Sequence, residues 1–224
     1  MKHLIAIFAF LILWQSAPAA RAFVGASNQF ISVGSIPTCL TAGNTRTVAF
    51  KFRVSSPSTR QTMFLVGAIS ESGNNRFDIE VYNSHLAVSY YSAIVESTTT
   101  IVADTWYHAI VAYNSGSLAI YVNGTVESTT SVALSTGSDR FNIGAFVSGY
   151  QPMTGELADL AIYAGDVGAF GRTSLAAGAP PCSVRPELLE AYIPFVRDLN
   201  DVVGALALTD NNGSTTADHP RTYR

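Results

Sequence analysis

Hydrophobic and polar residues alternate in several short segments of the chain. In residues 47–54 every second side chain is apolar, and Lys51 and Arg53 occupy positions between the apolar ones. Residues 76–81 repeat the pattern, with Phe, Ile and Val alternating with charged residues. Successive side chains of a β-strand point to opposite faces, so each segment is expected to bury one face and to expose the other. The pattern predicts strands that are half in solvent.

A second group of segments is apolar on both faces. Residues 106–113 and 118–122 carry apolar or aromatic side chains at most positions, which is typical of central strands covered on both sides. A short Asn-Ser-Gly-Ser segment joins them, and Asn123-Gly124 follows the second. Asn-Gly is the dipeptide that most readily accepts the positive φ angles of a type I′ turn. Two successive hairpins are therefore predicted.

Other short strands are expected at residues 86–91, 141–145 and 157–163, separated by Gly, Ser and Asn turns. Helical patterns are almost absent, and only residues 166–177 and 186–190 indicate short helical turns. Many short strands with regularly spaced turns favour two packed sheets. The prediction is an all-β fold, an antiparallel jelly-roll β-sandwich with one or two short helical turns.

Composition favours a single globular domain, which we place at residues 23–224. Hydrophobic residues make up 48% of the chain and charged residues 13%, enough apolar material for a large core. The formal net charge is −3, and no basic stripe with interleaved aromatic residues occurs. These properties argue against a nucleic-acid partner.

The N-terminal segment, residues 1–22, resembles a secretory signal peptide. Lys2 and His3 precede an apolar run, residues 4–14, and the small-x-small sequence Ala20-Arg21-Ala22 predicts cleavage after Ala22. The run is shorter than the roughly 20 residues of a membrane span. The mature protein would then be secreted or periplasmic. The alternative is that the segment stays attached as an apolar arm that packs against a partner subunit.

Two cysteines, Cys39 and Cys182, lie far apart in the sequence. In an oxidising compartment a bond between them would close a long loop and stabilise the fold. Two unpaired thiols are the alternative, and the sequence does not decide between them.

Three motifs together resemble one known family. Residues 104–125 read DTWYHAIVAYNSGSLAIYVNGT, residues 139–146 read DRFNIGAF, and residues 155–163 read GELADLAIY. This succession resembles the laminin-G-like branch of the concanavalin A-like lectin and glucanase superfamily. The resemblance extends from about Gly25 to the end of the chain, and it implies a concanavalin A-like sandwich.

The C-terminal part resembles phage and prophage members of that family. Its characteristic pieces are residues 174–178, 184–188, 192–195, 198–201 and 218–221. Such members are regarded as virion-surface or host-contact modules, so the resemblance implies coat or tail proteins as partners. The chain departs from them in its apolar leader and at Ile193, where a Trp is expected. These departures favour a secreted or periplasmic lectin-like protein instead.

The same fold also carries glycoside hydrolases, which use two carboxylates on either side of the scissile bond. Their Glu-x-Asp-x-x-Glu strand has no counterpart in this chain. The nearest pair is Asp78 and Glu80, which share one strand face with Arg76. The arginine would stabilise both carboxylates as anions, the opposite of what a general acid needs. We therefore expect a solvated sheet face there and no catalytic residue.

A glycan site would use exposed aromatic residues that stack on sugar rings, with acids and amides that bind hydroxyls. The candidates are the trio just named, tyrosines of the sheet, and a tyrosine–glutamine pair in a loop: Arg76, Asp78, Glu80, Tyr82, Tyr91 (or its neighbour Tyr90), Tyr150 and Gln151. The alternative is that these are ordinary surface residues of a β-protein.

A calcium site is a further implication of the resemblance, because many laminin-G-like sandwiches hold Ca²⁺ through aspartates and carbonyls at the rim. Asp104, Asp139 and Asp159 are the candidates, although the acidic loop expected near the first strand is replaced by residues 26–29, ASNQ. No His or Cys spacing indicates another metal or a cofactor. His108 is expected to be a packed histidine with one hydrogen bond.

The sequence therefore favours a non-enzymatic surface-binding or structural module. It would bind carbohydrate or another surface polymer, or it would act as a decoration or fibre protein of a virion, with coat proteins or copies of itself as partners. Weak sites of this kind gain strength from copy number. The alternative is a secreted glycoside hydrolase of the same fold.

Overall fold

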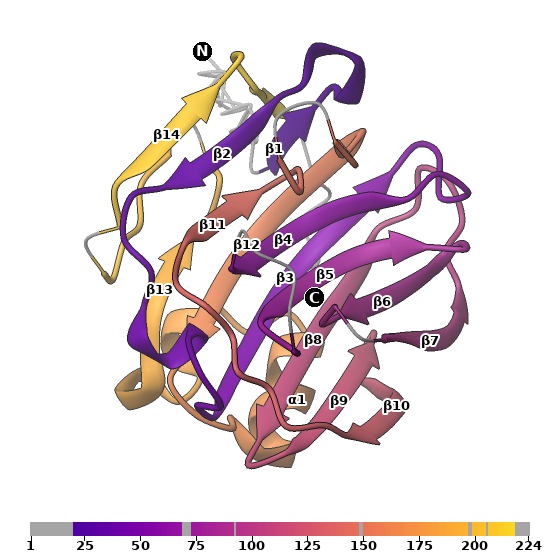
Figure 1. Ribbon diagram of the computed structural model, residues 1–224. Helices are drawn as coiled ribbons and strands as arrows, with labels where there is room; N and C mark the ends of the chain where they lie inside the picture. Colours follow the sequence, from indigo (N-terminus) through magenta and orange to yellow (C-terminus); the bar gives the residue numbers. More distant parts are fainter. Residues whose placement is uncertain are drawn as a thin grey trace, which may run out of the picture.

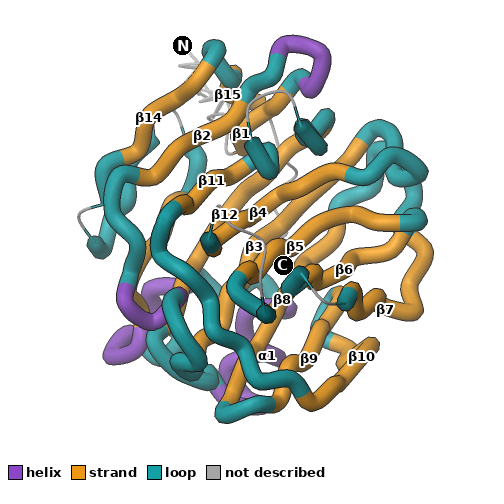
Figure 2. The backbone as a smooth tube through the Cα atoms, viewed as in Figure 1, coloured by secondary structure: helices purple, strands orange, loops and turns teal. Residues whose placement is uncertain are grey.

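A computed structural model of the protein describes residues 20–68, 73–91, 93–147, 150–196, 199–204 and 206–217. Within these ranges two antiparallel β-sheets stack face to face (Figure 1). Strands dominate the fold, and the helical segments are short (Figure 2). The predicted antiparallel jelly-roll sandwich is confirmed. Most of the predicted leader lies outside the described residues, which begin at Ala20.

The first sheet, sheet A, is centred on β3, which pairs with β8 on one side and with β12 on the other. Along one edge of β12, β1 pairs with residues 155–157 and β13 with residues 160–163. In spatial order the strands are β10 (Thr125–Ser131), β9 (Ser117–Val122), β8 (Tyr107–Asn114), β3 (Arg46–Val54), β12 (Gly155–Tyr163), β1 (Ala20–Phe23) and β15 (Thr215–Ala217), with β13 (Leu189–Ile193) beside β12.

The second sheet, sheet B, carries the face on which the candidate site lies. Its strands, in spatial order, are β14 (Leu208–Asn211), β2 (Phe30–Val33), β11 (Arg140–Ile143), β4 (Gln61–Gly67), β5 (Arg76–Tyr82), β6 (His85–Ser89) and β7 (Ile94–Thr100). The strands predicted at residues 47–54, 76–81 and 86–91 correspond to β3, β5 and β6. Those predicted near residues 106–113, 118–122, 141–145 and 157–163 correspond to β8, β9, β11 and β12. The sequence pattern therefore located the central strands of both sheets.

The helical segments are short and lie between strands in the sequence. They are α1 (Gly168–Ala176) and four 3-10 turns, η1 (Gly25–Ser27), η2 (Thr38–Leu40), η3 (Pro181–Ser183) and η4 (Pro186–Leu188). The two helical turns predicted at residues 166–177 and 186–190 match α1 and η4. None of the helices in the described part of the chain has the length and hydrophobicity needed to cross a bilayer.

The main core fills the space between the two sheets. Phe50, Phe52, Phe64, Phe77 and Phe141 belong to it and are almost completely buried. A smaller apolar cluster lies on the other side of sheet A, where α1 covers the sheet. It consists of Ala49, Ile110, Ala161, Tyr163, Val167, Leu175, Val184 and Leu189. Sheet A is thus apolar on both faces, which explains why β8 reads as apolar at nearly every position.

A single arginine is buried inside the main core. Arg46 is 0% exposed, and its guanidinium lies 4.5 Å from the ring centre of Phe77 and 5.2 Å from that of Tyr113. It donates a hydrogen bond of 2.7 Å to Thr136 Oγ1, and within the described residues it forms no ion pair with an acid. Burial lowers the pKa of Arg46 to about 10. Two aromatic faces therefore take the place of a counter-ion.

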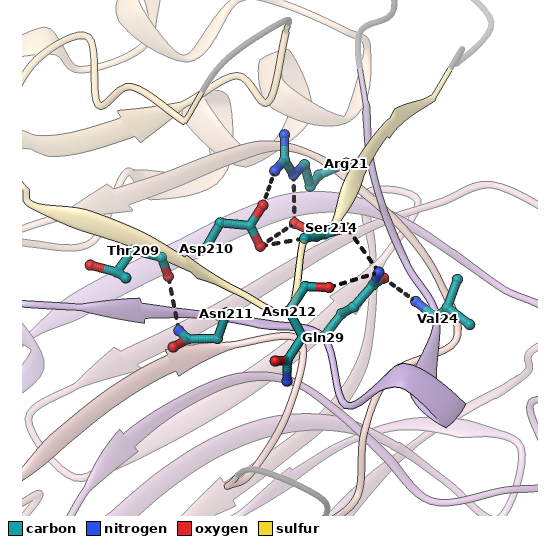
Figure 3. Close-up of polar contacts among 9 residues, drawn as sticks. Arg21, Val24, Gln29, Thr209, Asp210, Asn211, Asn212 and Ser214 are labelled. Atoms are coloured by element: carbon teal, nitrogen blue, oxygen red, sulfur yellow. Dashed lines mark hydrogen bonds and ion pairs between the residues drawn. The ribbon is translucent and has the colours of Figure 1, made fainter.

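The two ends of the described chain lie side by side at one edge of the sandwich (Figure 3). Arg21 of β1 forms an ion pair with Asp210 of β14 and donates a 2.6 Å hydrogen bond to Ser214 Oγ. Nearby, Gln29 donates a 2.9 Å hydrogen bond to the carbonyl of Gly213. These contacts join the beginning of the described chain to its end.

We expect the substitution Arg46→Ala to lower the free energy of unfolding by about 3–5 kcal/mol, because it removes the contacts with both rings and leaves a cavity and unpaired carbonyls. Urea denaturation followed by circular dichroism measures this change. The matched control is Arg185→Ala, since the Arg185 side chain is 47% exposed and its ion pair with Glu187 lies at the surface. That control should change stability by no more than about 0.5 kcal/mol. Equal effects of the two substitutions would contradict the structural role of Arg46.

Candidate ligand-binding face

Three charged residues of β5 lie on the outer face of sheet B, and they are covered. Phe77, Ile79 and Val81 point into the core, so the alternate residues Arg76, Asp78 and Glu80 point away from it. Their exposed fractions are only 8%, 1% and 0%. The prediction that this trio forms a solvated sheet face is therefore wrong.

The loop that follows β11 covers this part of the sheet. The amide of Gly144 donates a hydrogen bond to Met63 of β4, and the amide of Thr62, also on β4, donates one to the carbonyl of Gln151. Between these two anchors the ring of Phe146 lies 4.9 Å from the guanidinium of Arg76. The loop thus excludes water from β5, although the loop lies much later in the sequence than β5 does. Strand alternation alone does not reveal such a cover.

Ion pairs compensate for the burial of these charges. Glu80 accepts two hydrogen bonds from Arg60, of 2.6 Å from Nε and 2.8 Å from Nη2, a bidentate arrangement. Asp78 pairs with Arg76 at 3.3 Å. Burial raises the pKa of Glu80, and the hydrogen bonds and charge of Arg60 act in the opposite direction. Asp78 and Glu80 therefore each have an arginine partner.

Aromatic side chains surround this charged floor and reach solvent. Tyr91 and Tyr150 are 44% and 55% exposed. Tyr91 lies 5.8 Å from the guanidinium of Arg76, and Tyr150 packs edge-on against Phe146 at 5.5 Å between ring centres. Tyr82 lies under the guanidinium of Arg60 at 5.1 Å. The floor and its aromatic border together form what we call the charged-aromatic face: Arg60, Arg76, Asp78, Glu80, Tyr82, Tyr91, Phe146, Tyr150 and Gln151.

The structure thus brings together all seven residues that the sequence proposed for ligand binding. Gln151 joins the face through its Oε1 atom, which accepts a 3.0 Å hydrogen bond from Thr62 Oγ1. Arg60 and Phe146 also belong to the face and were not predicted from the sequence. Strand pairing could have indicated Arg60, because β4 begins directly after it and Thr62 lies opposite Glu80. The alternative tyrosine, Tyr90, is buried in the main core and does not belong to the face.

Two residues of the face adopt left-handed backbone conformations. Tyr91 has φ = 82° and Gln151 has φ = 49°. A bulky residue with positive φ costs on the order of 1–3 kcal/mol, and such strain gathers at functional sites. At Tyr91 the conformation directs the ring toward Arg76 at the border of the face. Positive φ also occurs elsewhere in the described chain, for example at the buried Phe195 (φ = 60°), so this strain alone does not locate a function.

The predicted calcium ligands lie in separate elements. Asp104 is in the turn before β8, Asp139 in the turn before β11, and Asp159 on β12. Asp159 already forms an ion pair of 2.8 Å with Lys51 and accepts a 2.9 Å hydrogen bond from Tyr192. Among the residues that the structure describes, no group of three His, Cys, Asp or Glu side chains is arranged to hold a metal ion.

The two cysteines are free thiols in the structure, the second of the two predicted arrangements. Cys39 is buried in η2, and burial raises its pKa to about 12. Cys182 is exposed in η3. A thiol with so high a pKa is protonated at neutral pH and behaves as part of the apolar core.

His108 lies beside a pocket of about 180 Å³ on the opposite face of the sandwich. Burial, followed by the nearby charge of Lys51, lowers the pKa of His108 to about 4, so the imidazole is neutral at pH 7. Its Nδ1 atom has no hydrogen-bond partner among the described residues. The packed, neutral histidine agrees with the prediction, whereas a hydrogen bond at this nitrogen is not formed.

Known proteins share the fold of this chain. The family model described as the concanavalin A-like lectin/glucanases superfamily matches residues 25–168. No curated protein matches the chain in sequence. The described architecture is similar to that of a candidate carbohydrate-binding protein from Bacteroides ovatus ATCC 8483, with a TM-score of 0.70 and 20% identity over 91% of this chain and 61% of that chain. This chain therefore spans about three fifths of the length of the Bacteroides protein.

Two further solved structures share the fold. A native heptameric SAP-like pentraxin from Limulus polyphemus has a TM-score of 0.63 and 15% identity, over 89% of this chain and 95% of that chain. The K499G mutant of NanB sialidase from Streptococcus pneumoniae has a TM-score of 0.55 and 16% identity, over 70% of this chain and 28% of that chain. At these identities the similarity establishes the fold alone.

We expect Arg60→Ala to destabilise the protein by about 3 kcal/mol at pH 8, because it leaves the buried Glu80 carboxylate without its partner. Without Arg60 the pKa of Glu80 rises further above its unfolded value. A carboxyl with a raised folded-state pKa contributes stability below its unfolded pKa and loses that contribution as pH rises through the folded value. The loss should therefore shrink between pH 8 and pH 5, which urea denaturation at both pH values measures.

The control for this experiment is the double variant Arg60→Ala/Glu80→Leu. It removes both charges together and should recover most of the stability at pH 8. A loss for Arg60→Ala that is the same at both pH values, or that the second substitution leaves unchanged, would contradict the buried ion pair.

Proposed function

Because the chain belongs to the concanavalin A-like lectin/glucanases superfamily, we propose that it is a carbohydrate-binding, lectin-like module that acts through the charged-aromatic face. The observation that carries the proposal is the pair of exposed tyrosines, Tyr91 and Tyr150, over a buried floor of ion-paired charges. Sugar rings present apolar C–H faces and a rim of hydroxyl groups. Aromatic side chains bind the C–H faces, and fixed charged groups bind the hydroxyl groups.

The ion pairs make the floor suitable for binding and unsuitable for proton transfer. Asp78 and Glu80 are at most 1% exposed, so neither carboxylate reaches a substrate oxygen directly. Their arginine partners remain fixed in place, and Arg60 keeps 32% of its side chain in solvent. Arg60 and the amide of Gln151 are therefore the polar groups best placed to contact a ligand. A rigid floor with few mobile groups also limits the entropy lost on binding.

The names of the similar structures support this assignment at the level of class. The Bacteroides structure is of a candidate carbohydrate-binding protein, and the streptococcal structure is of a sialidase. We propose that the module acts outside the cell, where such polymers occur. The virion-surface role stays a prediction, since none of the three structures is of a virion protein.

We expect Tyr91→Ala and Tyr150→Ala each to weaken glycan binding by roughly fivefold to tenfold, because each removes one stacking surface. Binding is first detected on a glycan array, where many copies amplify a weak site, and is then measured by isothermal titration calorimetry. Phe170→Ala is the matched control, because Phe170 of α1 is 86% exposed and lies on the opposite side of the sandwich. It should bind as the unmodified protein does.

Two outcomes would contradict the proposed site. One is a protein that binds none of the arrayed glycans. The other is a set of variants in which Phe170→Ala loses binding while both tyrosine variants keep it. Thermal unfolding of each variant shows whether a loss of binding comes from a loss of fold.

A glycoside hydrolase is the second candidate, because burial raises the pKa of Glu80 and because Asp78 lies two residues away on the same strand face. A raised pKa is one property of a general acid. Since both groups are buried and paired, we expect no release of new reducing ends from any bound glycan. Release that Glu80→Gln abolishes would establish the hydrolase and overturn the binding-module proposal.

A further inference from the structure

The first described strand contains the three residues at which the sequence pattern predicts signal cleavage. Residues 20–22, the small-x-small sequence, form most of β1. Ala20 is 0% exposed and lies opposite Ala217, and Ala22 lies opposite Glu156 on one side and Thr215 on the other. A cut after Ala22 would therefore remove most of a paired strand and leave only Phe23 of it.

Loss of these residues would leave several groups without partners. In the described residues β15 pairs only with β1, so this strand would lose its neighbour. Asp210 would lose its ion pair with Arg21, and Ser214 would lose a 2.6 Å hydrogen bond (Figure 3). Residues 156 and 157 of β12 would also lose their partners in β1. Buried polar groups without partners cost free energy, so the folded protein disfavours this cut.

The position of Phe23 gives a second reason. Phe23 is 2% exposed, and its ring fits against Gly144, where even a Cβ atom would lie 2.6 Å from the ring. A cut after Ala22 would leave Phe23 at the free end of the chain. Terminal residues are poorly ordered unless strand pairing holds them, so the packing of this ring would be weakened.

The sequence offers one other small-x-small pattern between the apolar run and β1. It is Ala17-Pro18-Ala19, and a cut after it would fall directly before Ala20. We infer that the leader is removed between Ala19 and Ala20, so that the mature protein begins with β1 intact. A signal peptidase would hydrolyse the Ala19–Ala20 amide with one water molecule, leaving a carboxylate on Ala19 and an amino group on Ala20. This inference goes beyond the proposed function and does not depend on glycan binding.

The first test is the N-terminal sequence and intact mass of the full chain after secretion by a bacterial host. A protein that begins at Ala20 supports the inference. A protein that begins at Phe23, at Met1 or at any other residue overturns it. The two mature forms differ by Ala-Arg-Ala, which intact mass resolves easily.

Substitutions in the two small-x-small sequences provide a second, independent test of the cleavage position. Ala17→Leu/Ala19→Leu should abolish the mature form, because a signal peptidase requires small residues at these positions. The matched control, Ala22→Leu, should leave processing unchanged. The reverse result, with processing lost only in Ala22→Leu, overturns the inference.

Arg21→Ala distinguishes the two cuts by stability as well. If the mature protein begins at Ala20, it contains residue 21, and loss of the ion pair with Asp210 should lower the unfolding temperature by roughly 5 °C or more. If the cut follows Ala22, residue 21 is removed with the leader, and the secreted variant is identical to the unmodified protein. An unchanged unfolding temperature therefore overturns the inference.

Discussion

The candidate site depends on the pairing of buried charges on the outer face of β5. Strand alternation sends Phe77, Ile79 and Val81 into the core and forces the charged residues between them onto the other face. A loop could cover that face only if each charge found a partner, because an unpaired buried charge costs several kcal/mol. The arginines at positions 60 and 76 provide those partners. The covering loop then holds Phe146 and Tyr150 at the border, so the aromatic part of the face is a consequence of the ionic part.

The outer surfaces of the two sheets differ in character. On sheet A, α1 packs over Ala49, Ile110 and Tyr163 and covers part of the outer surface with apolar contacts. On sheet B, by contrast, the outer surface is polar and bordered by exposed tyrosines. Apolar packing thus covers part of the outer face of sheet A, and the charged-aromatic face of sheet B is the one that we propose for a ligand. Arg46, between the sheets, links them through Phe77 of sheet B and Tyr113 of sheet A.

Sequence reasoning succeeded where local pattern determines structure. Alternation in residues 47–54 located β3, and the Asn123-Gly124 turn, with φ angles of 50° and 84°, joins β9 to β10 as expected. It failed where distant segments meet. Nothing in residues 76–81 reveals a cover supplied by residues 144–147 and 150–153. The short β1 and β15 also lack the alternation that would predict a strand. The seven ligand candidates could be named because tyrosines and alternating charged residues are local features, and their role in binding stays a prediction. Arg60, by contrast, required knowledge of strand register.

The neighbouring positions of β1 and β15 have a consequence for the order of folding. Contacts between segments from opposite ends of the chain close a very long loop, and such contacts form late because of the entropy lost in closing it. The central strands from β3 to β12 can pair first. Strands β1, β14 and β15 can complete the edge only after residues 208–217 have been released for folding. A protein whose two ends must meet before its sheet is complete stays open for longer after synthesis. That delay suits the proposed secretion, in which a chain crosses a membrane unfolded before it folds.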